Sequence, residues 1–139
     1  AAPEWQRYLE RGQAAQTLPE LLPDWPEGEA SEDERHAMRI LEGRVPDTET
    51  GFNNLQKRLL AAAELSQAAA RSVKMMRIVG EAMVLGLEAR DRVGVGTLQG
   101  ELEALARREP PLFEISGEGE MRFCEVRLTD AGKVLAEGL

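Results

Sequence analysis

Apolar and small side chains recur in steps of four and three along residues 52–92, a stretch that contains no proline. The positions that follow this spacing are Leu55, Leu59, Ala62, Ser66, Ala69, Val73, Met76, Gly80, Met83 and Leu87. The spacing places these side chains on one face of an α-helix. We therefore predict a long central helix over residues 52–92, whose apolar face, here called the seam, is the main hydrophobic surface of the fold. Gly80 and Gly86 each lower helix propensity by about 1 kcal/mol relative to alanine, so the alternative is a pair of helices that breaks near one of them.

The first 51 residues contain several short patterns. Residues 3–11 predict a short helix, and residues 18–26 combine three prolines with large apolar side chains, including Trp25. Proline cannot continue a helix, so we expect residues 18–26 to form an apolar strap on the core. Ser31 and Glu34 have the spacing of a capping box, which predicts a helix from this point to Gly43.

Two further helices are predicted in the last third of the chain. Thr97 is a suitable N-cap for a helix over residues 98–108, and the pair Pro110-Pro111 ends it. Residues 130–137 predict a short closing helix.

Between these two helices the sequence predicts a β-hairpin. Residues 112–116 and 121–128 alternate as strands do, and a turn at Glu118-Gly119 would pair Phe113 with Cys124. The face turned to the core would then carry Phe113, Ile115, Cys124, Val126 and Leu128. The opposite face would carry Leu112, Glu114, Met121, Phe123 and Glu125.

These elements predict a mainly α fold with a small C-terminal β-hairpin (α+β). The chain would comprise an N-terminal helical and proline-rich segment (residues 1–51), a central helical segment (52–92) and a C-terminal segment (93–139). At 139 residues it is long enough to bury a core, and we expect the three segments to form one compact domain.

Residues 128–135 have the sequence Leu-Thr-Asp-Ala-Gly-Lys-Val-Leu and directly follow the predicted helix and hairpin. This order resembles the C-terminal end of winged-helix regulators of the MarR and PadR type, in which Leu-Thr-x-x-Gly-x-x-Leu often follows the β-wing. The resemblance covers residues 97–139. It implies that residues 98–108 occupy the place of a recognition helix and residues 117–120 the tip of the wing.

Charge is distributed unevenly along the chain, whose net charge is −8. Residues 1–51 carry 12 acids and 5 bases (−7), residues 52–96 carry 4 and 7 (+3), and residues 97–139 carry 9 and 5 (−4). A basic middle between acidic ends predicts internal charge matching. It differs from the basic excess on one face that is typical of a nucleic-acid-binding protein.

The predicted recognition helix carries Glu101 and Glu103, and the predicted wing tip carries Glu118 and Glu120. Phosphate contacts supply most non-specific DNA affinity, so carboxylates at these positions disfavour DNA binding. Apolar residues surrounded by charged ones are typical of a protein interface. The predicted partner-binding residues are Leu112, Glu118, Glu120, Met121, Phe123 and Glu125. The alternative is that the strap with Trp25 covers this face.

Catalytic and cofactor chemistry has little support in the sequence. His36, the single histidine, has no second histidine or cysteine nearby as a metal partner, and Cys124 is expected to be a small buried hydrophobe. Gly94 and Gly96 lack the spacing of a dinucleotide-binding loop. We therefore predict no enzymatic activity, no cofactor and no bound metal.

We predict a cytoplasmic protein with no membrane segment. The chain has a single cysteine and no signal-peptide pattern, and charged residues interrupt its apolar run 75–87. The favoured function is a non-enzymatic regulatory or adaptor protein that binds another protein, possible roles including transcription regulation.

Three alternatives remain open. The first is a DNA-binding regulator, for which the candidate residues are Arg71, Lys74, Arg77, Arg107 and Arg108. The second is a helical oligomerisation module in which the seam pairs between chains. The third is a piece of a larger protein whose other part carries the chemistry.

Overall fold

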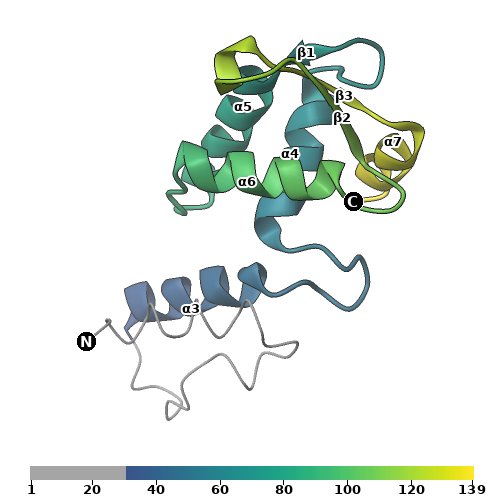
Figure 1. Cartoon of the computed structure of the whole chain (residues 1–139). Helices are drawn as coiled ribbons and strands as arrows, with labels where there is room; N and C mark the ends of the chain where they lie inside the picture. Colours follow the sequence, from purple (N-terminus) through teal and green to yellow (C-terminus); the bar gives the residue numbers. More distant parts are fainter. Residues whose placement is uncertain (1–30) are drawn as a thin grey trace. The chain divides into compact units, whose positions relative to one another are not determined.

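The computed structural model describes residues 31–139, which belong to two compact units that divide after residue 54: residues 31–54 and residues 55–139. The described residues form five α-helices, one short 3-10 helix and a three-stranded antiparallel sheet (Figure 1). The protein is therefore mostly helical with a small amount of β structure, as the sequence predicts. The predicted helix over residues 3–11 and the predicted strap over residues 18–26 lie outside the described residues.

In the first unit, α3 (Glu32–Arg44) begins at the predicted capping box. The Glu34 amide donates to the Ser31 hydroxyl at 3.1 Å, and the Ser31 amide donates to the Glu34 carboxylate at 3.3 Å. These two bonds satisfy amides that the start of a helix leaves without intrahelical partners. The prediction for this helix is confirmed.

The second unit contains α4 (Asn54–Leu65), whose first residue belongs to the first unit, and all later elements. These are β1 (Val73–Lys74), α5 (Met75–Glu88), α6 (Val95–Ala106), β2 (Phe113–Ser116), the 3-10 helix η1 (Met121–Phe123), β3 (Glu125–Leu128) and α7 (Asp130–Glu137). The strand order is β1-β3-β2. In Figure 1, α4, α5 and α6 lie on the same side of this sheet. Their largest fully buried side chains include Leu59, Leu60, Met75, Ile78, Val79, Leu98, Leu102 and Leu105, together with Phe113 and Val126 from the sheet.

The single long central helix is a wrong prediction. The segment is a pair of helices, as in the alternative, but the break does not lie near Gly80 or Gly86 as expected. The break lies at residues 66–72, and Gly80 and Gly86 are both inside α5. At the end of α4, the Ala68 amide donates to the Ala63 carbonyl at 2.9 Å and the Gln67 amide donates to the Glu64 carbonyl at 3.0 Å. These bonds form a Schellman motif with Gln67 at φ 60, in a position that glycine usually occupies. Because the residue is glutamine, the sequence contains no glycine to mark this helix end.

The end of α5 is formed in the same way. Arg90 has φ 57, and the Asp91 amide donates to the Gly86 carbonyl at 2.8 Å. The next helix, α6, then begins at Val95 with Gly94 as its N-cap, three residues before the helix predicted from Thr97. Strand β1 was not predicted from the sequence. Two residues are too few to show the alternation by which a strand is recognised.

The predicted hairpin register is wrong by four residues. Phe113 pairs with Leu128 and Ile115 pairs with Val126, so the connecting loop is longer than a tight turn and contains η1. Gly117, at φ +100, is required where this loop begins, because a Cβ there would clash with the backbone of Phe123 and Cys124. An even shift keeps each strand residue on its predicted face. Phe113, Val126 and Leu128 are accordingly buried, as is Cys124.

We expect Gln67→Gly to raise the free energy of unfolding by about 0.5–1 kcal/mol. A non-glycine residue in the left-handed conformation costs roughly 1–2 kcal/mol, part of which the greater freedom of glycine in the unfolded chain offsets. Urea denaturation measures the change. The control is Ala61→Gly inside α4, which should lower stability by about 1 kcal/mol. If both substitutions destabilise equally, Gln67 does not end the helix as described.

Candidate partner-binding surface

The predicted apolar centre of the hairpin does not form. Phe123 is exposed to 60%, but Leu112 and Met121 are buried. Leu112 precedes β2, where its amide donates to the Leu105 carbonyl at 3.1 Å and its side chain enters the core. Met121 begins η1, which packs against α5. Because η1 is a helical turn, strand alternation does not apply to it, and of the three apolar residues only Phe123 is exposed.

The acidic residues predicted to surround that centre are all exposed, and three of them lie beside a basic residue, Glu114 being the cross-strand partner of Arg127. Glu120 forms an ion pair with Arg122 at 2.8 Å, and the Arg122 guanidinium lies 4.7 Å from the centre of the Phe123 ring. Glu125 is the cross-strand partner of Lys74 on β1. Opposite charges at such positions attract, so the tip and the outer face of the sheet are less acidic than their sequence alone indicates.

A different apolar surface is present on α5. Met76, Val84 and Leu87 are exposed to 46%, 49% and 54%, and Gly80 and Met83 lie between them at helical spacing. We call these five residues the α5 stripe. The opposite side of α5 packs into the core through Met75, Ile78, Val79, Ala82 and Gly86.

Four residues of the α5 stripe belong to the seam that the sequence predicts to be buried. These residues are Met76, Gly80, Met83 and Leu87. The first half of the seam is buried in α4, where Leu55, Leu59 and Ala62 face the core. The interruption at residues 66–72 removes the helical phase relation between the two halves. Consequently α5 buries an adjacent apolar face and leaves its part of the seam on the surface.

Phe123 lies near the N-terminal end of the α5 stripe. The Met75 amide donates to the Cys124 carbonyl at 3.1 Å, which fixes the start of α5 beside the end of η1. Large exposed apolar side chains close together are characteristic of binding surfaces.

The place predicted for a recognition helix, α6, presents few bases. Gln99, Glu101 and Glu103 are half-buried, and the Gln99 amide group donates to the Glu103 carboxylate at 3.2 Å. Gly96 and Gly100 are exposed on the same helix.

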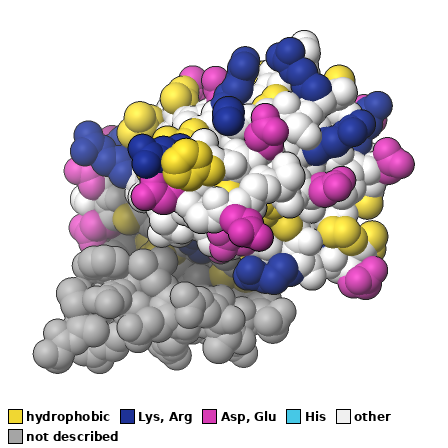
Figure 2. All heavy atoms as spheres, turned by 45° about the horizontal axis from the view of Figure 1, so that its top comes forward, with side chains coloured by type: hydrophobic (Ala, Val, Ile, Leu, Met, Phe, Trp, Pro, Cys, Tyr) yellow, Lys and Arg dark blue, Asp and Glu magenta, His cyan; other side chains and the backbone are white. Residues whose placement is uncertain are grey.

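The residues predicted for nucleic-acid binding are all exposed and fall into two groups along the sequence. Arg71, Lys74 and Arg77 follow one another around β1, and Arg107 and Arg108 follow the end of α6. On the face shown in Figure 2, Lys and Arg side chains are interspersed with Asp and Glu. Charge of alternating sign is a poor match to a phosphate backbone.

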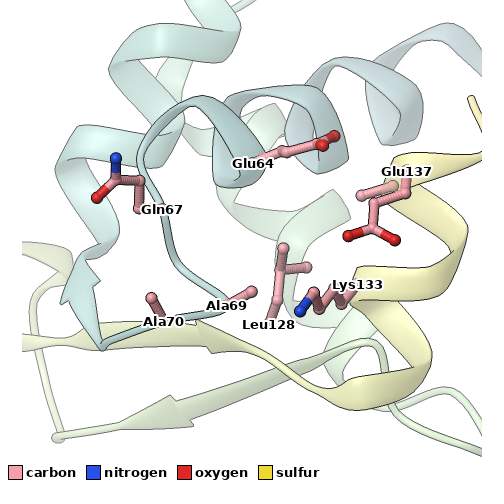
Figure 3. Close-up of a pocket in the computed structure, with 8 residues that line it drawn as sticks. Glu64, Gln67, Ala69, Ala70, Leu128, Lys133 and Glu137 are labelled. Atoms are coloured by element: carbon pink, nitrogen blue, oxygen red, sulfur yellow. The ribbon is translucent and has the colours of Figure 1, made fainter.

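A hollow of about 270 Å³ lies between the end of α4 and α7. Figure 3 shows Lys133 and Glu137 on α7, Glu64 on α4 and the apolar side chain of Leu128 around it. One lysine (+1) and two carboxylates (−2) leave this hollow with a formal charge of −1. The residues that line this hollow include no histidine, cysteine or serine that could act as a nucleophile with a neighbouring base.

Residues 31–139 contain neither a metal-binding cluster nor a membrane-spanning helix. This range contains no group of three or more His, Cys, Asp or Glu side chains placed to hold a metal ion. His36 is half-buried on α3. Cys124 is buried, as predicted, with its thiol 3.7 Å from the Glu120 carbonyl. In the same range, no helix combines the length and the apolar composition needed to cross a bilayer.

Comparison with known proteins identified no relative, since no family model, curated protein or solved structure matches the chain.

Proposed function

We propose that this protein is a non-enzymatic regulatory or adaptor protein that binds another protein through the α5 stripe and the neighbouring Phe123. In this proposal residues 55–139 are a winged-helix module. The order α4-β1-α5-α6-β2-β3, with β3 between the two other strands, supports that assignment. In this assignment α5 would be the helix that precedes the recognition helix, α6.

The observation that carries the proposal is the exposure of Met76, Val84 and Leu87 along one side of a well-packed helix. Burying a large apolar side chain is worth about 1.5–3 kcal/mol relative to leaving it in water. A rigid helix also presents such side chains to a partner with little loss of conformational freedom. The half-buried carboxylates of α6 and the lack of any Lys or Arg within this helix support a protein partner over DNA.

Affinity capture with three versions of the full chain tests the proposal. The versions are the natural chain, the double variant Met76→Ser/Leu87→Ser, and the control Val134→Ser/Leu139→Ser, which removes exposed apolar side chains near the C-terminus. We expect the natural chain and the control to retain the same proteins from a lysate of the source cell. The α5 variant should lose them while its far-UV circular dichroism spectrum stays unchanged.

Two results would contradict the proposal. One is equal retention by all three versions, which would remove the α5 stripe as the binding surface. The other is tight binding of duplex DNA at low salt that falls steeply as salt is added, the behaviour of a protein that contacts many phosphates.

A further inference from the structure

The α5 stripe is complementary to itself, and we propose that a second copy of this chain covers it. The two α5 helices would pack face to face and antiparallel about a two-fold axis. This inference rests on the proposed function, because it names the partner for the same surface. A two-fold pairing requires that one surface fit its own copy, so the stripe must match in both shape and charge.

The shape match follows from the order of large and small residues. If the axis passes near position 82, Met76 of one copy lies opposite Leu87 of the other, and Gly80 lies opposite Val84. A Cβ placed at Gly80 would meet no atom within 4 Å, so the surface there is open. Val84 of the second copy can therefore approach the Gly80 backbone closely. The same contact occurs twice, once on each side of the axis.

The charge match follows from one edge of the stripe. At 100° per residue, Arg77 and Glu88 lie on the same edge, one near each end of α5. Glu81 lies on that side too, but further from the stripe. An antiparallel pairing places this edge beside its own copy, so that Arg77 meets Glu88 of the other chain at both ends. Both side chains are exposed, and among residues 31–139 neither has an ion-pair partner. A parallel pairing would put the two charged edges on opposite sides.

The contact is modest in size. The 14 residues of α5 span about 21 Å, and Phe123 adds apolar surface near the N-terminal end of each helix. An interface built mainly from one helix pair lies at the small end of specific protein interfaces. We therefore expect reversible association at micromolar protein concentrations. In such a dimer the second half of the seam, on α5, is buried between two chains, whereas the first half, on α4, is buried within one chain.

Sedimentation equilibrium of the full chain with charge-reversal variants tests the inference. Arg77→Glu places two acids opposite each other, and Glu88→Arg places two bases opposite each other. We expect each single variant to raise the dimer dissociation constant about ten-fold or more, because both ends of the interface change from attraction to repulsion. An equimolar mixture of the two single variants should restore association, and so should the double variant Arg77→Glu/Glu88→Arg. The control Lys133→Glu, on α7, should leave the dissociation constant unchanged.

The other outcomes would overturn self-pairing. They are a natural chain that stays monomeric at all concentrations, a dimer that none of these charges affects, or weakened single variants that do not recover when mixed. The proposed function would survive the first of these results if affinity capture still depended on Met76 and Leu87. It would fail separately if capture did not depend on them.

Discussion

Gly132→Ala is expected to lower the free energy of unfolding by about 3 kcal/mol or more. A Cβ at position 132 would overlap the carbonyl oxygen of Leu112 and lie 3.0 Å from the Leu128 side chain. Relief would require α7 to move away from the backbone that leads into β2. That backbone is held in place, because the Leu112 carbonyl accepts from the Thr129 amide at 3.1 Å. Overpacking against fixed backbone is among the few causes of large single-residue effects.

The same contacts explain the Leu-Thr-x-x-Gly pattern on which the winged-helix resemblance depends. Leu128 is buried at the end of β3. The Thr129 hydroxyl accepts from the Gly132 amide at 3.0 Å, which caps α7, and donates to the Pro111 carbonyl at 2.7 Å. Gly132 then allows α7 to approach Leu112. The pattern therefore fastens the last helix to the start of β2, which is a packing role independent of any ligand.

Gly100→Ala is the matched control for Gly132→Ala. Gly100 is also inside a helix, α6, but a Cβ there would meet no atom within 4 Å. Replacing this glycine should raise stability by up to about 1 kcal/mol through helix propensity alone. Urea denaturation of both variants should thus give changes of opposite sign. Similar values for the two would show that α7 does not approach β2 as closely as described.

Familiar signals located some helix ends correctly but not the start of α6, where Thr97 was the expected N-cap and the helix begins at Val95. Ser31 and the segment 130–137 marked two helices correctly, because capping side chains are visible as residue types. Gln67 and Arg90 end α4 and α5 in the conformation that glycine usually adopts, so nothing in their identity marked those ends. The single long helix was predicted for this reason.

The candidate surface was hidden by a related ambiguity. Periodicity shows which residues share a face of a helix, but the choice of buried face depends on what packs against it. α5 is apolar around most of its circumference, and only Arg77, Glu81 and Glu88 interrupt it. Either of two overlapping apolar faces could therefore have been buried, and the predicted seam follows the face that is exposed. α5 contains more apolar residues than one buried face requires. This excess was the signal that could have identified an exposed stripe.

One buried ion pair, with both residues in the basic middle segment 52–96, carries the second large effect that we expect. The Arg58 guanidinium on α4 lies 2.6 Å from the carboxylate of Asp91, which follows α5, and their side chains are exposed to only 13% and 6%. We expect Asp91→Ala to lower the free energy of unfolding by about 3 kcal/mol, because it leaves the Arg58 charge largely desolvated with no counterion at that position. Urea denaturation at neutral pH measures this loss.

The exposed pair Arg122–Glu120 supplies the control, since its N–O distance of 2.8 Å is similar but its side chains are 68% and 69% exposed. Glu120→Ala should change stability by less than about 1 kcal/mol, as is usual for ion pairs in water. The double variant Arg58→Met/Asp91→Ala should lose less than Asp91→Ala alone, because it removes the buried charge together with its partner. If Asp91→Ala were as mild as Glu120→Ala, water would have to reach Arg58. In that case the pair would not hold the end of α5 against α4.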